Sequence, residues 1–165
     1  MKLDSLHALY IQELRDLYHA EKQILKALPK VIDATNAAEL RTALSHHLEE
    51  TKGHVTRLEQ VFQLHNEEAK TKVCGGMKGI LSEGEDILSH DESSAVRDAG
   101  IVAGCQKVEH YEIASYGSVC AWAEQMGHTK AAKILHETLE EEKHADRKLT
   151  EIGKRLNVET VSHAR

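Results

Sequence analysis

Hydrophobic residues recur at steps of three and four positions along most of the chain, and this is the period of one face of an α-helix. The first such run covers residues 3–28 and the second covers residues 40–62. The third follows residues 91–94 and continues to residue 126, and the fourth covers residues 134–156. The pattern therefore predicts four long helices, each with one apolar face to bury.

Particular residues mark the junction between the first two helices. Pro29 is expected to break or kink the first helix, because proline lacks an amide donor and disfavours a helical conformation in the residue before it. A turn or so of helix is expected to continue beyond it through Val31 and Ile32, before Thr35 and Asn36. Asn36, with Glu39 three positions later, predicts an N-cap and a variant of the capping box for the second helix. The second helix is expected to end near His65.

The ends of the last two helices carry similar markers. Gly127 is expected to end the third helix, after Met126, in the left-handed conformation that suits glycine. Thr129 is expected to cap the fourth helix. After Leu156 the chain is predicted to fray into a polar tail, residues 157–165.

The connection between the second and third helices, residues 66–92, is long and contains four of the ten glycines. It exceeds the 2–8 residues that usually join neighbouring antiparallel helices, but it can cross the whole length of a bundle. A short amphipathic patch from Met77 to Leu88 predicts an extra helix within it. Four helices with one long central crossover form the ferritin-like four-helix bundle, in which the second and third helices run parallel.

Composition narrows the fold class and the partners. Ala, Glu, Lys, Leu and Arg make up close to half of the 165 residues, there is one proline, and only 4% of the residues are aromatic. These values favour an all-α protein with a single domain, residues 1–165, over a β-sandwich or barrel. A net charge of −6 argues against nucleic-acid binding, and no apolar run reaches the roughly 20 residues of a membrane span.

The three cysteines indicate a reducing compartment. Cys74, Cys105 and Cys120 are odd in number and lack CxxC spacing, and the chain starts with no signal peptide, so free thiols in the cytoplasm are expected. Cys105 and Cys120 lie on the apolar face of their helix and should pack there. Cys74 lies in the glycine-rich connection and is expected to be the reactive thiol.

Several of the twenty glutamates fall on apolar faces when each helix is wound at 100° per residue. A lone glutamate at such a position is usually a solvated rim residue. Here carboxylates come from all four helices, and buried carboxylates repel one another unless a cation compensates them. The candidates are Glu21, Glu50 at the edge of its face, Glu109, Glu112 and Glu142, whereas Glu141 is expected to point outward with His144.

These carboxylates predict a site for two metal ions per chain, iron or manganese, because such ions favour oxygen and imidazole ligands. His54 is the best candidate imidazole and His47 the next; either is otherwise a hydrogen-bonded core residue. His110 and His136 are expected to face outward. The remaining histidines are expected to be scattered and solvated: His7, His19, His46, His65, His90, His128 and His163.

Four segments carry a family resemblance: LYHAEKQILKALPK, LSHHLEETKGHVTRLEQVF, RDAGIVAGCQKVEHYEIASYG and LHETLEEEKHADRKL. From about Leu3 to Leu156 the chain resembles the ferritin-like bacterial stress proteins of the YciE/YciF family. The resemblance implies a homodimer and a rubrerythrin-like dinuclear metal centre. The five glutamates match the family's acidic positions, whereas His54 stands where relatives carry glutamine.

The function expected from this resemblance is a reaction with a small oxidant, peroxide or dioxygen, of a catalase-like or peroxidase-like kind. Two alternatives stay open at this point. One is a stress or interaction module that metal ions stabilise without turnover. The other is a metal-free bundle with buried ion pairs.

Overall fold

The computed structural model of the chain describes residues 3–89 and 95–163, without the side chains of residues 159, 160, 162 and 163. The described residues form helices and no strand. The helices are α1 (Leu6–Ala34), α2 (Ala38–Leu64), α3 (Gly75–Leu88), α4 (Ala95–Gln125) and α5 (Thr129–His163). In this part of the chain no helix combines the length and the apolar character that crossing a bilayer requires.

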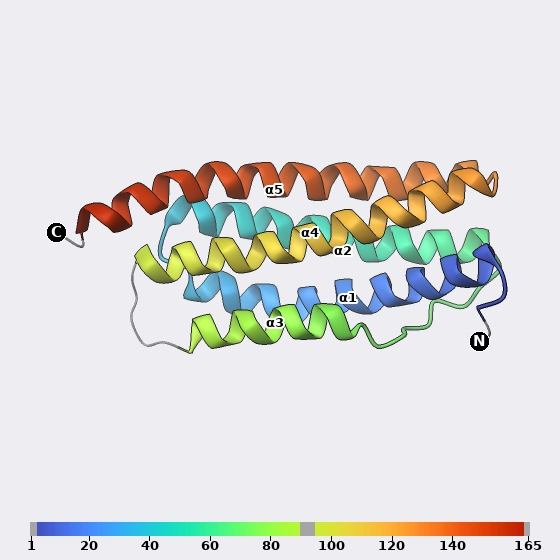
Figure 1. Cartoon of the computed structure of the whole chain (residues 1–165), viewed down its shortest axis with the longest axis horizontal. Coiled ribbons are helices and arrows are strands. Elements are labelled where there is room, and N and C mark those ends of the chain that lie inside the picture. Colours follow the sequence, from blue (N-terminus) through green and yellow to red (C-terminus); the bar gives the residue numbers. More distant parts are fainter. Residues whose placement is uncertain (1–2, 90–94, 164–165) are drawn as a thin grey trace.

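Four of the helices, α1, α2, α4 and α5, lie side by side as an elongated bundle, and the shorter α3 lies along α1 and α4 (Figure 1). The pairs α1–α2 and α4–α5 are antiparallel hairpins. Helices α2 and α4 run in the same direction, because the segment that contains α3 leads the chain back along the bundle (Figure 1). The predicted bundle, its long crossover and the extra helix are confirmed.

Helix α1 continues through Pro29 to Ala34, so Pro29 does not break the helix, and the expected further turn through Val31 and Ile32 is confirmed. Pro29 lies on the exposed side of the helix. The turn beyond it is retained because Val31 and Ile32 pack against the core. Thr35 then closes the helix, with its hydroxyl donating to the Val31 carbonyl at 2.7 Å.

The start of α2 is capped from another helix. The predicted cap at Asn36 is wrong: the cap position is Ala37, which has no side-chain acceptor. Asp98, buried in the first turn of α4, accepts hydrogen bonds from the backbone amides of Asn36 at 3.0 Å and Ala37 at 2.7 Å. One carboxylate thus joins the two hairpins at this end of the bundle.

The turn between α4 and α5 follows the prediction at Gly127, whose φ of 75° is left-handed. Thr129 is the first residue of α5 and not the cap before it. The predicted fraying after Leu156 is wrong, since α5 continues to His163 through a segment that contains no glycine or proline. Residues 91–94, after which the third long helix was expected to start, lie outside the described residues, as does His90.

The apolar core is divided into two clusters along the bundle. One includes Tyr10, Leu14 and Phe62 towards the α4–α5 turn, and the other includes Ile24 and Leu44 towards the α1–α2 turn. Between them each long helix contributes buried polar side chains. This polar layer is formed by Glu21, His47, His54, Glu109, Glu112 and Glu142.

Candidate metal centre

Helical spacing places each member of the polar layer on a buried face. Glu109 and Glu112 are one turn apart on α4, and His47 and His54 are two turns apart on α2, so each pair shares a face. Glu21 on α1 and Glu142 on α5 face them from the other two helices. All six side chains are at most 6% exposed.

The donor atoms of the layer form two groups that share one residue. In the first, single atoms of His47, Glu109, Glu112 and Glu142 lie within 4.8 Å of one another. In the second, the same holds for Glu21, His54 and Glu142. Both groups therefore meet at the Glu142 carboxylate, and each could hold one metal ion.

Several atoms of the layer lack hydrogen-bond partners. Among the described residues, both carboxylate oxygens of Glu112 and of Glu142 are buried without a hydrogen bond, as are one oxygen of Glu109 and one of Glu21. An unpaired buried polar atom costs about 1–3 kcal/mol, and more when it is charged. A cation is the partner that would satisfy several such oxygens at once, so the donor set fits a metal ion.

Burial, together with repulsion between neighbouring carboxylates, raises the pKa of two glutamates in the layer. Burial, and next the neighbouring Glu142, raise the pKa of Glu109 well above its usual range. Burial, followed by the charges of Glu21 and Glu142, does the same for Glu112. The two α4 carboxyl groups therefore retain protons at a pH where exposed glutamates are ionised.

His54 partly compensates the carboxylates. Its Nδ1 lies 2.9 Å from Glu142 Oε1 and 3.4 Å from Glu21 Oε1. Burial alone would lower the pKa of His54, but Glu21, Glu141 and Glu142 raise it well above its usual range. Burial likewise works against ionisation of Glu142, but its contacts with His54 leave its pKa below the usual value.

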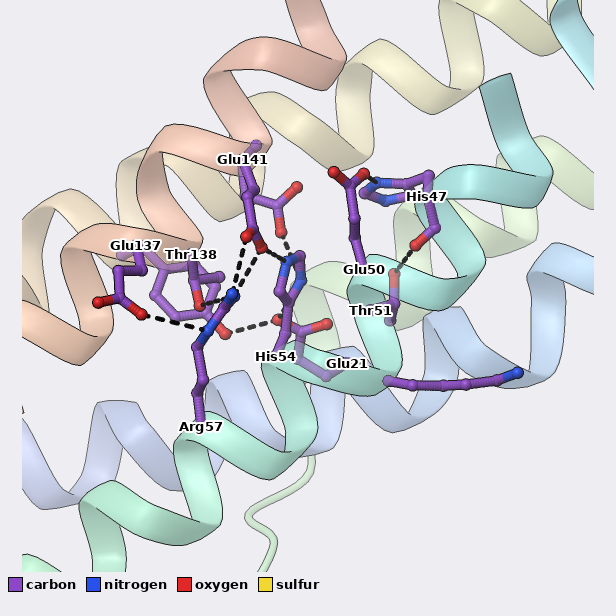
Figure 2. A network of polar contacts seen from close by, with 12 residues as sticks. Glu21, His47, Glu50, Thr51, His54, Arg57, Glu137, Thr138 and Glu141 are labelled. Carbon is purple, nitrogen blue, oxygen red and sulfur yellow. Dashed lines mark hydrogen bonds and ion pairs between the residues drawn. The ribbon is translucent and has the colours of Figure 1, made fainter. Parts of the chain in front are cut away.

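A second set of contacts holds His54 from the outer side. Glu141 accepts a hydrogen bond from His54 Nε2 at 2.9 Å and two from the Arg57 guanidinium at 2.6 and 2.7 Å (Figure 2). Arg57 also donates to Thr138 at 3.2 Å. Glu141 is half-buried, so the prediction that it points outward is wrong; His144, in contrast, is exposed as predicted. Helical winding missed this contact because it ignores what the neighbouring helix brings into reach.

Tyr116 performs a similar role for Glu21, and its ring also lies near His54, with the two ring centroids 6.5 Å apart. Its buried hydroxyl donates a hydrogen bond to Glu21 Oε1 at 2.5 Å. This bond uses one oxygen of Glu21 and leaves the other, Oε2, without a partner in the described part of the chain. Both Glu21 and His54 are thus oriented by a neighbour, as ligands at metal sites usually are.

Glu50 is not brought into either group of donors. Its side chain is 21% exposed, and Oε2 lies 3.1 Å from His46 Nδ1 and 3.8 Å from His47 Nδ1 (Figure 2). Burial alone would raise the pKa of Glu50, but the two histidines lower it below its usual value. Glu50 lines a pocket of about 160 Å³ that also reaches Glu109, so it stands at the rim of the layer.

His47 is more central than the sequence suggested. Winding α2 ranked it behind His54, yet both side chains are buried and His47 Nε2 lies 3.4 Å from Glu109 Oε1. In the described residues neither ring nitrogen of His47 makes a hydrogen bond. The alternative of a hydrogen-bonded core histidine therefore does not apply to His47.

A larger, mostly apolar pocket of about 400 Å³ approaches the layer between α1, α3 and α4. Ile24, Leu81 and Ile101 belong to its walls, and His47 and Glu109 also line it. The layer is thus approached by cavities from two sides of the bundle. The connection that contains α3 supplies one wall of this pocket, a role that the sequence did not predict.

The three cysteines are buried or half-buried. Cys74 is fully buried and is the N-cap of α3, where its sulfur accepts a hydrogen bond from the Met77 amide at 3.3 Å. Burial raises its pKa, so the prediction of a reactive thiol at Cys74 is wrong. The position in a glycine-rich segment suggested exposure, but the segment folds as a helix packed on α1 and α4.

The fold and the layer together define an all-helical bundle protein whose buried carboxylates and imidazoles could hold metal ions. The profile of the family described as "Domain of unknown function (DUF892)" matches residues 5–162, and the chain belongs to this family. Protein YciF of Escherichia coli strain K12 is 45% identical over 154 residues, which are 93% of each chain.

Solved structures agree with this assignment. The crystal structure of the E. coli stress protein YciF matches with a TM-score of 0.90 and 44% identity, over 93% of this chain and 98% of that one. YcfI from Rhodopseudomonas palustris matches with a TM-score of 0.86 and 40% identity, over 91% and 97% of the two chains. A protein from Xanthomonas campestris, at 21% identity and a TM-score of 0.76 over 96% and 97%, shares the fold. The resemblance to the YciE/YciF family is confirmed.

Proposed function

We propose that this chain is a bacterial stress-response protein that binds two metal ions, iron or manganese, in the polar layer and reacts with peroxide or dioxygen. The observation that carries the proposal is the convergence of buried carboxylate oxygens, several of them without a hydrogen bond among the described residues, on two positions that share Glu142. The similarity to a protein described as a stress protein supports the physiological part.

The donor groups suggest how the ligands divide. His47, Glu109, Glu112 and Glu142 would hold one ion, and Glu21, His54 and Glu142 the other. Glu50 is proposed as a further ligand that turns inward from the rim next to His47. When bound, such a pair of ions supplies reversible one-electron changes of oxidation state to a small oxidant.

The surrounding side chains prepare the ligands for this task. Glu141 accepts a hydrogen bond from His54 Nε2, and this contact orients the ring so that Nδ1 faces Glu21 and Glu142. Arg57 keeps Glu141 ionised, since contacts with His54 and Arg57 lower the pKa of Glu141 to about 2 despite partial burial. Because their pKa values are raised, Glu109 and Glu112 retain protons in the metal-free protein. They would release these protons when a cation binds in the place of the protons.

The size of the pockets fits a small, uncharged substrate. Aliphatic side chains form much of the wall of the larger pocket, and Lys26, Lys30, Lys78 and Glu85 also line it. This pocket reaches His47 and Glu109, so it offers a peroxide or dioxygen molecule a way to the polar layer.

Disproportionation of hydrogen peroxide is the reaction that this chain can complete without another protein. One peroxide is oxidised to dioxygen and loses two protons and two electrons, while a second takes them up and yields two water molecules. A peroxidase cycle needs an outside electron donor, and the three separated cysteines form no CxxC pair that would bind an electron-transfer iron.

The test compares two neighbouring glutamates of α5. Metal-free protein, Glu142→Gln and Glu140→Gln are loaded with Fe(II) or Mn(II), and bound metal and dioxygen release from peroxide are measured. Glu140 is exposed, so its variant should bind two ions and turn over as the wild type does, whereas Glu142→Gln should lose at least one ion and most of the turnover. No turnover above that of free metal in the wild type would refute the catalytic proposal.

A metal-stabilised module without turnover is the second candidate, favoured by the origin of the ligands on all four long helices. Ions held in this way join both hairpins and stabilise the folded chain by mass action. The signature would be two bound ions and a rise in melting temperature, without peroxide consumption. A homodimer is proposed on the family resemblance alone.

A further inference from the structure

Three histidines that the sequence analysis expected to be scattered lie together at one end of the bundle. His7 is in the first turn of α1, His65 directly follows α2, and His128 is in the turn between α4 and α5. In Figure 1 these three segments meet at the end near the N-terminus. The expectation that the three are scattered is wrong, because it considered each helix alone.

The three imidazole rings are in mutual contact. The ring centroids of His65 and His128 are 4.6 Å apart, and His7 lies 5.8 Å from each. One ring nitrogen of each residue lies within 4.8 Å of the other two. Nitrogens bound to zinc in a tetrahedron lie about 3.4 Å apart, so small side-chain rotations would complete the geometry.

Backbone hydrogen bonds hold the chain in place at two of the three histidines. The amide of His128 donates to the Ala123 carbonyl at 2.8 Å, and Gly127 before it is held in the left-handed conformation. The amide of His65 donates to the Phe62 carbonyl at 3.1 Å. His7 follows the capped start of α1, where Ser5 accepts a hydrogen bond from the Ala8 amide at 3.1 Å.

The environment also suits neutral imidazole, which is the form that binds metal ions. The Tyr10 hydroxyl lies 3.2 Å from His65 Nε2 and can orient this ring, as a group beyond the ligands does at metal sites. Burial, followed by the neighbouring His128 and His7, lowers the pKa of His65 below its usual value of 6.5. No carboxylate belongs to this group of donors among the described residues.

We propose that His7, His65 and His128 form a second metal site, separate from the polar layer, that binds one Zn²⁺ through three imidazoles. Three nitrogen ligands without a carboxylate favour zinc over manganese. Because His7 is exposed, water occupies the remaining position. The bound ion fastens the start of α1 to the end of α2 and to the α4–α5 turn.

The test counts zinc ions in variants of the full chain. Equilibrium dialysis against Zn²⁺, with metal analysis, is applied to the wild type, His128→Gln, His7→Gln and the control His110→Gln, whose histidine is 70% exposed elsewhere on α4. The wild type and the control should bind one more zinc than the two triad variants, or bind that zinc at least about ten-fold more tightly.

Two further measurements keep the result independent of the polar layer. Glu112→Gln disturbs the layer and should leave the additional zinc in place. In histidine side-chain NMR spectra of this variant, the first equivalent of Zn²⁺ should shift the resonances of His7, His65 and His128. Equal zinc binding in His128→Gln, His7→Gln and His110→Gln, or unchanged resonances of the three histidines, would overturn the proposal.

Discussion

At the scale of single residues, Glu112 shows most clearly how a side chain suited to binding a metal ion can destabilise the metal-free fold. Its two carboxylate oxygens are fully buried and, within the described residues, accept no hydrogen bond. Burial and the charges of Glu21 and Glu142 raise its pKa well above the usual 4.5. A carboxyl group with a higher pKa in the folded than in the unfolded chain binds its proton more tightly when folded. It therefore destabilises the metal-free protein increasingly as the pH rises above 4.5.

Glu112→Gln should remove this effect. We expect the metal-free variant to melt about 2–4 °C higher than the wild type at pH 8, which corresponds to about 1 kcal/mol in a chain of this size. Its melting temperature should also fall less between pH 5 and pH 8. Thermal unfolding followed by circular dichroism measures both quantities.

Addition of Mn(II) should reverse the order, because only the wild type keeps the full set of ligands. The exposed Glu124 on the same helix provides the control: Glu124→Gln should follow the wild type with and without metal. A variant Glu112→Gln that melts lower than the wild type in the absence of metal at pH 8 would contradict this interpretation.

The sequence was sufficient for four of the five carboxylates, but it did not place Glu50 outside the donor groups and did not identify the neighbours of the buried side chains. Glu21, Glu109, Glu112 and Glu142 were found because burial on a helix follows from the residue's own position relative to the apolar stripe. The contact between Glu141 and His54 depends on the distance between α2 and α5, and the triad of His7, His65 and His128 depends on where three chain ends meet. Neither quantity is encoded in the period of a single helix.

Among the elements, α2 is stabilised at its start by a residue from another helix. The carboxylate of Asp98 is 2% exposed and accepts from the amides of Asn36 and Ala37. Asp98→Ala would leave these amides without their acceptor, and we expect a loss of about 2 kcal/mol in the free energy of unfolding. Chemical denaturation at neutral pH measures the change.

A matched control is available near the same end of the bundle. Asp33 on α1 is exposed, so Asp33→Ala should change the stability by less than about 0.5 kcal/mol. Equal effects of the two substitutions would show that Asp98 is not a cap. The local sequence favours Asn36 as the cap because Glu39 follows three positions later, whereas Asp98 lies 62 positions further along the chain.

At the scale of the whole molecule, α3 and the crossover complete a cavity that the four long helices alone would leave open. Gly104 on α4 lines this pocket, and a Cβ atom added to it would meet no other atom within 4 Å. Gly104→Leu should therefore fill the pocket without distorting the helix. We expect the rate of metal uptake, or of peroxide consumption by loaded protein, to fall several-fold, as measured by stopped-flow spectroscopy.

A substitution at Gly117, also on α4, is the control that distinguishes blocked access to the pocket from a change in helix propensity. A Cβ atom at Gly117 likewise meets nothing within 4 Å, and Gly117 does not line the pocket. Gly117→Leu should leave these rates unchanged, while both variants should bind the same number of ions at equilibrium. Equal rates in the two variants would indicate that small molecules reach the layer by the other pocket, next to Glu50.

The overall topology was predictable because it depends on the lengths of the helices and of the connections between them. Four runs of helical period and a connection too long for a tight turn leave few arrangements, and the parallel course of α2 and α4 follows from the crossover. The further turn of α1 beyond Pro29 was expected, whereas the continuation of α5 past Leu156 was not. Packing of the neighbouring turns decided the first, and the absence of any glycine or proline sustained the second.

The position of Glu142 in both donor groups has a consequence for occupancy. Under the proposed function, two ions that share one side chain are thermodynamically linked. The first ion ionises and orders the carboxylates, so the second finds ligands that are already prepared. When metal is scarce, a population of chains would then divide into empty and fully loaded molecules. The supply of metal would then determine how many molecules hold both ions, and it would hardly affect the activity of each loaded molecule.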